Sequence, residues 1–235
     1  SPNFLASLKY WICPLWIMRT EVTQKRVEFK FEVKPVNISS VMNQIFTSKY
    51  IIIPHHNKRL VNSIYFDSSN LSELENSIEG LYKKKKLRYR FYGDISEIKS
   101  QINGQWELKK KQGIVTEKIV HKEVVDFDKI FSPNLSTFRS SNSSINYEIN
   151  TYPYLSKFIS YEREYFVSKL FGDDLRVTID KNILSKEFIN NNLKRTRRLD
   201  TNIVELKIKH KLYEDVSFQN MNFLTRVGFS KYSEA

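Results

Sequence analysis

The sequence predicts an α+β fold, namely an antiparallel β-barrel with a charged lumen and a few flanking helices. Two observations support this prediction. From about residue 25 onward, apolar and polar residues alternate with a period of two, which is typical of β-strands. Segments with helical spacing are fewer. With 235 residues, 40% of them hydrophobic, the chain fits one large domain, expected at 25–235 after an N-terminal flank at 1–24.

Strands are predicted wherever this alternation is clear. The segments are 26–33, 61–66, 87–92, 106–111, 157–167, 175–180 and 203–209. In the first segment, Glu28, Lys30 and Glu32 share one face, and valines and phenylalanines occupy the other. The fifth and sixth segments are expected to form a hairpin around Gly172, because glycine and aspartate between alternating segments favour a turn.

Helices are predicted from apolar positions near helical spacing and from capping residues, at 38–50, 71–78 and 213–227. A short helical turn is expected at 153–158. Segments rich in Ser, Asn or Arg are predicted as loops, at 132–146 and 187–200. His55 and His56 are expected in another loop, and the histidines show no metal-ligand spacing.

Five of the predicted strands carry a compact charged signature on one face and large apolar side chains on the other. One such strand indicates only a sheet with a solvated face. Five together favour a barrel with a charged lumen, the inverse of the usual small barrel. Like charges about 4 Å apart repel by roughly 4 kcal/mol at an effective dielectric of 20, so this lumen requires an anionic ligand. Arg and Lys bind phosphate oxygens, and interleaved Glu can hold Mg²⁺ or Mn²⁺.

The formal net charge of +12 indicates an anionic partner, and nucleic acid, anionic lipid, nucleotide and polyphosphate all have the required sign. Nucleic acid is not expected, because the strand aromatics fall mostly on the face opposite the cations. The single cysteine, Cys13, excludes an internal disulfide and a cysteine-based zinc site. The apolar stretch at 10–18 is too short to span a bilayer, and it is expected to pack on the domain or to lie at a membrane surface. The expected location is the cytoplasm, including the inner face of the membrane.

Eight short motifs resemble, in order, the VTC (vacuolar transporter chaperone) domain in its bacterial form. They are RVEFK at 26–30, NSIYFD at 62–67, KLRYRFYG at 86–93, WELK at 106–109, SYER at 160–163, LRVTID at 175–180, VELK at 204–207 and FSKY at 229–232. Each motif is weak alone, whereas the shared order over 26–232 is specific. The family belongs to the triphosphate tunnel metalloenzyme superfamily, whose antiparallel tunnel barrel agrees with the predicted fold.

The resemblance implies a polyphosphate polymerase that transfers the γ-phosphoryl group of ATP to a growing inorganic polyphosphate chain, with Mn²⁺ or Mg²⁺. ATP and polyphosphate are then the partners, and a membrane-protein partner stays open. The implied catalytic, phosphate-binding cations are Lys30, Arg88, Arg90, Lys109, Arg163 and Lys231. The implied secondary substrate contacts are Lys86, Tyr161, Arg176 and Lys207. The implied metal ligands are Glu205 first, with Glu28 and Glu107 assisting it or pairing with lysines. Asp67 and Asp180 are expected to cap turns, to pair with arginines or to bind metal.

Two alternatives share this fold. An inorganic triphosphatase or a cyclase-like enzyme would use the same cations and metal on a shorter substrate. Those relatives typically show Glu-x-Glu-x-Lys in the first strand, whereas Glu28-x-Lys30 follows the VTC pattern, which favours the polymerase. A non-catalytic module that binds polyphosphate or inositol phosphate could keep the same tunnel, although the joint presence of the cations and Glu205 favours catalysis.

Overall fold

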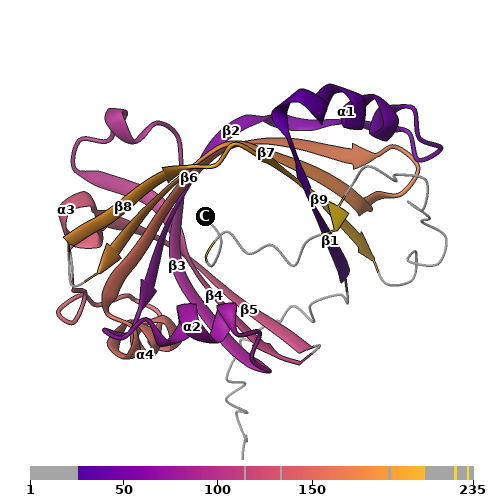
Figure 1. Cartoon of the computed structure of the whole chain (residues 1–235). Coiled ribbons are helices and arrows are strands. Elements are labelled where there is room, and N and C mark those ends of the chain that lie inside the picture. The colour runs from indigo at the N-terminus through magenta and orange to yellow at the C-terminus, as the bar shows by residue number, and fades with distance from the viewer. Residues whose placement is uncertain are drawn as a thin grey trace, which may run out of the picture.

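One antiparallel sheet of ten strands forms the frame of the protein (Figure 1). The computed structural model describes residues 26–113, 115–132, 134–189, 192–209, 225–226 and 232. The strands are β1 (Arg26–Val33), β2 (Ile52–Asp67), β3 (Lys83–Tyr92), β4 (Gln101–Gln112), β5 (Val115–Asp126), β6 (Tyr154–Ser168), β7 (Gly172–Ile189), β8 (Asn192–Arg198), β9 (Asn202–Lys209) and β10 (Thr225–Arg226). Their spatial order is β10-β1-β9-β7-β6-β2-β3-β4-β5, and β8 pairs with the second half of β7.

The sheet curves strongly, so that it has a concave and a convex side (Figure 1). Its end strands are β10 and β5, and each pairs with a single neighbour within the described ranges. Closure into a barrel requires hydrogen bonds between the two end strands. The predicted antiparallel sheet is therefore confirmed, whereas the predicted closed barrel is corrected to an open, curved sheet.

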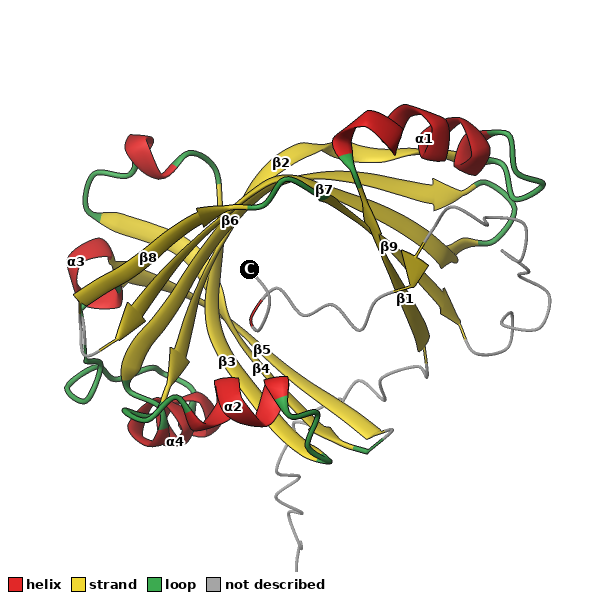
Figure 2. Ribbon diagram, in the orientation of Figure 1, coloured by secondary structure: helices red, strands yellow, loops and turns green. Residues whose placement is uncertain are grey.

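Short helical segments connect the strands: η1 (Pro35–Asn37), α1 (Ile38–Phe46), α2 (Ser72–Ile78), η2 (Ile95–Glu97), α3 (Phe127–Ile130) and α4 (Ser143–Thr151). Figure 2 shows α1 at one end of the sheet and α3 and α4 at the other. None of the helices in these ranges is long and apolar enough to cross a membrane.

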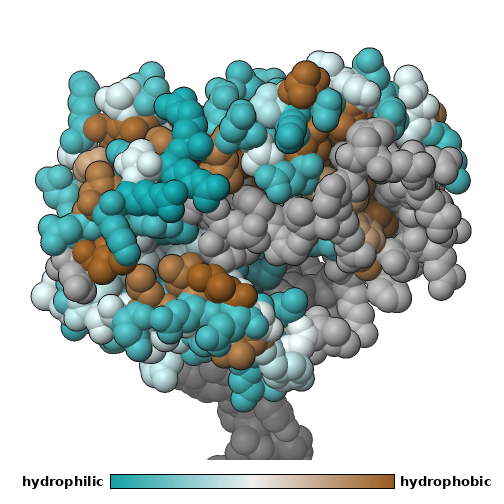
Figure 3. All heavy atoms as spheres, in the orientation of Figure 1, coloured by the Kyte–Doolittle hydropathy of each residue, from teal (hydrophilic) through white to brown (hydrophobic). Residues whose placement is uncertain are grey.

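Two apolar clusters join these helices to the convex side of the sheet. Val41 and Ile45 of α1 pack with buried residues of β1, β7 and β9. Ile130 of α3 and Ile145 of α4 pack with a second cluster that contains the fully buried Trp106. Because these clusters use the apolar side of each alternating strand, the charged side of the same strands is turned to the concave side. Figure 3 shows that the visible surface is mostly hydrophilic, with apolar patches between.

The seven predicted strands are confirmed, and most run longer than the alternation indicated. The hairpin between β6 and β7 is also confirmed. Two predicted helices correspond to α1 and α2. For the third, at 213–227, Thr225–Arg226 is a strand and the remainder lies outside the described residues.

Several element predictions were wrong. His55 and His56 belong to β2, not to a loop, and the turn expected at 153–158 is the start of β6. The loop expected at 132–146 contains the first turn of α4. The loop expected at 187–200 contains the end of β7 and all of β8. Every residue of β8 is exposed, so this strand has no apolar face and gave no alternating signal.

Candidate functional site

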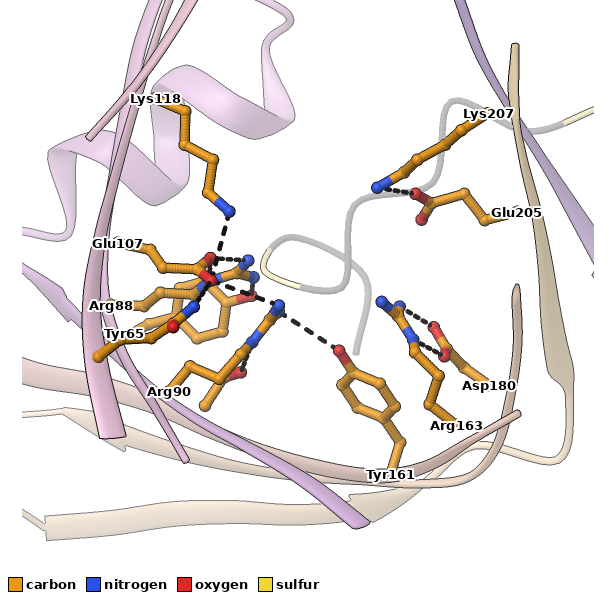
Figure 4. Close-up of polar contacts among 12 residues, drawn as sticks. Tyr65, Arg88, Arg90, Glu107, Lys118, Tyr161, Arg163, Asp180, Glu205 and Lys207 are labelled. Carbon is orange, nitrogen blue, oxygen red and sulfur yellow. Dashed lines mark hydrogen bonds and ion pairs between the residues drawn. The ribbon is translucent and has the colours of Figure 1, made fainter. Parts of the chain in front are cut away.

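Strand register brings the predicted cations of β3 and β4 together on the concave side. Arg88 lies opposite Glu107, and Lys86 lies opposite Lys109. Residues directly opposite each other in an antiparallel pair project from the same face. Figure 4 shows the labelled side chains of this group pointing into the space on the concave side.

The other wall of this space is built in the same way by β1, β7 and β9. Glu28 lies opposite Lys207, and Lys30 lies opposite Glu205. On the other side of β9, Arg176 of β7 also lies opposite Lys207. In Figure 4, Glu205 and Lys207 face the Arg88 side of the space. The structure thus brings residues as far apart in the sequence as Glu28 and Lys207 onto one face.

Glu107 is the centre of the charge network. Its side chain is only 3% exposed, and Arg88 donates to its Oε2 from Nε at 2.9 Å and also from Nη2. Lys118 Nζ lies 3.3 Å and Arg90 Nη1 3.6 Å from Oε1. Burial alone would raise the pKa of Glu107, but these three cations outweigh burial and hold the pKa well below its usual range. Glu107 is therefore a buried carboxylate counter-ion whose charged form the three cations favour.

Hydroxyl groups orient the two arginines of β3. Arg88 Nη1 donates to Tyr65 Oη at 2.9 Å. Arg90 donates to Ser63 Oγ and to Tyr161 Oη, each at 3.4 Å. These contacts fix the guanidinium groups while leaving their remaining N–H groups for an anion, because each guanidinium carries five donors.

Arg163 is held by a bidentate ion pair. Its Nε and Nη2 donate to the two carboxylate oxygens of Asp180 at 2.5 and 2.7 Å, and Asp180 is fully buried. The guanidinium also lies 5.2 Å from the centroid of the Tyr161 ring. Arg163 and Tyr161 therefore belong on the concave side, and the prediction that Asp180 pairs with an arginine is confirmed.

Lys30, Lys86 and Lys109 lie close enough for the charges of Lys30 and Lys109 to act on Lys86. Burial, together with the neighbouring charges of Lys30 and Lys109, lowers the pKa of Lys86 to about 7. This coupling joins β1 to β3 and β4, which lie far apart in the order of the sheet. Like charges brought this close stabilise a bound anion, because the anion relieves their repulsion.

Two carboxylates lie on the same wall as Lys30, across the space from Lys86 and Lys109. Lys207 Nζ lies 2.9 Å from Glu205 Oε1 and 3.7 Å from Glu28 Oε1. Thr178 lies opposite Glu205, and its buried Oγ1 has no hydrogen-bond partner among the described residues. Glu205, Glu28 and this hydroxyl are hard oxygen donors on one patch, which is the chemistry that Mg²⁺ and Mn²⁺ prefer.

No cluster of three or more His, Cys, Asp or Glu suited to a metal occurs within the described ranges. Mg²⁺ is commonly bound through one or two carboxylates together with substrate phosphates, so the pair Glu205 and Glu28 fits such an ion when phosphate is present. Glu107 fits it less well, because both of its oxygens already contact cations.

The other predicted residues have different outcomes. Arg176 lies near the rim of the sheet, where its Nε is 3.7 Å from Oδ1 of Asp173 at the start of the same strand, β7. Lys231 lies outside the described residues. Its neighbour Tyr232 is 2% exposed, donates to Asp67 Oδ2 at 2.5 Å, and stacks on Tyr65 with ring centroids 4.9 Å apart.

Sequence reasoning missed Lys118 and Tyr65. Lys118 lies in β5, a strand that was not predicted, and it is on the site face because it pairs with Lys109. Tyr65 was inside a predicted strand, and its alternation with Ile64 and Phe66, which are buried in the convex cluster, places it on the charged face. The alternation thus carried a usable signal for Tyr65, whereas Lys118 needed the register.

Comparison with known proteins gives a family and weakly similar solved structures. A candidate adenylyl cyclase from Hippeastrum, described as having a dominant triphosphatase activity, is 13% identical with a TM-score of 0.45, covering 88% of this chain and 94% of that one. A candidate adenylate cyclase from Vibrio parahaemolyticus is 15% identical with a TM-score of 0.45, covering 88% of this chain and 95% of that one. No curated protein matches the chain significantly. The model of the VTC domain matches residues 7–235, nearly the whole chain, and the protein therefore belongs to the VTC domain family.

Proposed function

We propose that this VTC domain is a polyphosphate polymerase that uses ATP as phosphoryl donor. The observation that carries this proposal is the gathering of Arg88, Arg90 and Arg163, a lysine cluster, and the carboxylates of Glu205 and Glu28 on one concave face. In this proposal the concave face acts as the charged lumen in which a phosphate chain lies. We place the reaction in the cytoplasm.

The reaction requires no nucleophile from the protein. A terminal oxygen of the polyphosphate acceptor attacks the γ-phosphorus of ATP, a new P–O bond forms, and the bond between the γ-phosphorus and the β,γ-bridging oxygen breaks to release ADP. Catalysis of such a transfer depends on positioning and on charge neutralisation. The arginines supply N–H forks for the oxygens of the triphosphate, and Lys30, Lys86 and Lys109 neutralise the neighbouring phosphates.

A divalent cation fits beside this machinery. Glu205 and Glu28 would hold Mg²⁺ or Mn²⁺, whose chemical contribution is to neutralise charge on the phosphate oxygens. Glu107 keeps its arginines fixed and balances their charge when no substrate is bound. We infer that Lys231 and Lys207 act as further phosphate contacts, and Arg176 as a contact near the rim.

The first experiment is to incubate the protein with ATP and Mn²⁺ and to measure long-chain polyphosphate by gel staining together with ADP. Polymer with a matching amount of ADP is the expected result. Free phosphate without polymer would instead identify a triphosphatase, in which water replaces the acceptor. Tight polyphosphate binding without turnover would identify a binding module.

Two variants test the role of the cations. Lys30→Ala and Arg90→Ala are expected to lose polymerase activity while keeping the folded circular dichroism spectrum of the parent protein. Lys99→Ala, which removes an exposed lysine after η2, is the matched control and is expected to keep full activity. Normal turnover in both site variants would rule out this mechanism.

A further inference from the structure

Three side chains from three strands meet beyond the arginines of the site. The guanidinium of Arg59 in β2 lies 5.6 Å from the ring centroid of Tyr92 in β3 and 5.7 Å from that of Tyr165 in β6. The His56 ring approaches Tyr165 edge-on, with centroids 5.7 Å apart. Arg59 and the two tyrosines are called the tyrosine–arginine platform below.

Register places this platform on the same face as the phosphate-binding residues. Val61 lies opposite both Tyr92 and Tyr161, and Arg59 lies opposite Arg163. Along β3 the site face reads Arg88, Arg90, Tyr92, and along β6 it reads Tyr161, Arg163, Tyr165. On each strand a tyrosine therefore follows the arginine by two residues.

This spacing matches the layout of a nucleotide. Two residues of a strand span about 6.6 Å, which is comparable to the length that a ribose places between a base and its first phosphate. A ligand whose phosphates contact Arg90 and Arg163 would bring its base to the platform. An inorganic phosphate chain has no group to place there.

The platform has the chemistry and exposure that base stacking needs. Tyr92 is 44% exposed, Arg59 is exposed, and Tyr165 is half-buried. The neighbouring aromatics of β3, Tyr89 and Phe91, are instead fully buried in the convex cluster. Bases stack on tyrosine rings and on arginine guanidinium planes without a requirement for a given base edge.

We propose that the tyrosine–arginine platform binds the purine base of the nucleoside triphosphate donor by stacking. This inference rests on the proposed function only in that the donor is a nucleotide. The platform would select a nucleotide over an inorganic triphosphate, and the cations of the site would carry out the phosphoryl transfer.

The test compares two ligands that differ in the base. Titration calorimetry measures the affinity of the whole protein for the non-transferable β,γ-imido analogue of ATP and for inorganic tripolyphosphate. Tyr92→Leu and Tyr165→Leu are expected to weaken the ATP analogue about tenfold and to leave tripolyphosphate within about twofold. Tyr92→Phe keeps the ring and is expected to behave as the parent protein. Tyr147→Leu, at an exposed tyrosine of α4, is the matched control.

The outcomes separate this inference from the proposed function. Equal binding of the ATP analogue by the parent protein and both leucine variants would overturn the platform, and so would an equal loss for both ligands. If the protein forms polymer but the leucine variants bind the ATP analogue as the parent protein does, the polymerase proposal is supported and the platform proposal is contradicted. A base-dependent affinity lost in the leucine variants, without polymer formation, would support the platform and remove the polymerase.

Discussion

At Glu107, one buried carboxylate meets three cations, Arg88, Arg90 and Lys118. Removing one member of a buried charge network leaves the others uncompensated in a poorly solvated place. Arg88, Arg90 and Lys118 would then repel one another, and a bound phosphate chain would replace the negative charge that they have lost.

We therefore expect Glu107→Gln, which keeps the shape and removes the charge, to lower the free energy of unfolding by about 3 kcal/mol. Urea unfolding measures this loss, and Glu97→Gln in the exposed η2 serves as the control. Added tripolyphosphate is expected to restore more stability to Glu107→Gln than to the parent protein. An unchanged unfolding midpoint in Glu107→Gln would contradict the assigned role.

Lys86 gives the site a dependence on pH. Burial and neighbouring lysines lower its pKa from 10.5 to about 7, so the side chain loses its charge in the folded protein as pH rises through 7. A bound phosphate chain favours the charged form, so binding takes up a proton above pH 7. For folding the sign is the opposite: the unfolded chain holds this proton up to about 10.5, so Lys86 contributes a loss of stability as pH falls from 10.5 to 7.

We expect the affinity for tripolyphosphate to weaken as pH rises from 6 to 9, in addition to any change from the ionisation of the ligand itself. Lys86→Arg separates the two effects, because arginine stays charged over this range. Calorimetric titrations at several pH values should show a flatter profile for Lys86→Arg. Identical profiles for the two proteins would remove Lys86 as the titrating group.

On the scale of elements, Asp67 joins a strand, a helix and the C-terminal part of the chain. It ends β2, and its carboxylate accepts from the backbone N–H groups of Glu73 and Leu74 in the first turn of α2. It also accepts from Tyr232 Oη. Ser156 of β6 lies 3.2 Å from the same hydroxyl. These contacts hold Tyr232, the residue after Lys231, against β2 and β6.

Tyr232→Phe tests this anchor. Loss of a hydrogen bond to a buried carboxylate is expected to lower stability by about 2 kcal/mol, because the carboxylate of Asp67 stays buried and loses a donor. Thermal unfolding measures the change. Tyr232→Phe should also raise the KM of the proposed reaction more than it lowers kcat, since the ring still stacks on Tyr65 and Lys231 is retained. A variant with the parent's unfolding temperature would show that Tyr232 does not anchor this segment.

The elements also show where sequence reasoning succeeds. β1, β9 and the β6–β7 hairpin were predictable because each has one apolar and one charged face. β8 has no apolar face, and in β2 the segment around His55 is exposed and carries register shifts, so neither could be read as a strand. Period-two alternation detects a strand only where one of its faces is buried.

On the scale of the whole molecule, the sequence could predict which strand face each site residue occupies. It could not predict which residues of neighbouring strands contact one another. Alternation alone placed Lys30, Arg88, Arg90 and Glu205 with the charged residues. It could not show that Glu107 balances two arginines, or that Lys118 from an unpredicted strand completes the network. These contacts depend on register between strands, and register is set by turns and bulges more than by composition. The predicted closed barrel failed for the same reason, because closure is a pairing between two end strands.

The net charge of +12 and the concave cationic face together make long polyanions better ligands than short ones. We expect a tripolyphosphate to contact the cations around Glu107 and Lys86, and a longer chain to reach cations toward the rim as well, such as Arg176. Each further contact adds an electrostatic attraction that salt weakens, since the Debye length is only about 8 Å at physiological ionic strength. We therefore expect the affinity for long-chain polyphosphate to fall more steeply with salt than the affinity for tripolyphosphate.

Titrations of both ligands over a series of KCl concentrations measure the two slopes. The Arg176→Ala variant should reduce the slope for the long chain and leave the slope for tripolyphosphate unchanged. Equal slopes for both ligands in the parent protein would confine phosphate binding to the cluster around Glu107 and Lys86, and the remaining positive charge would then serve another partner.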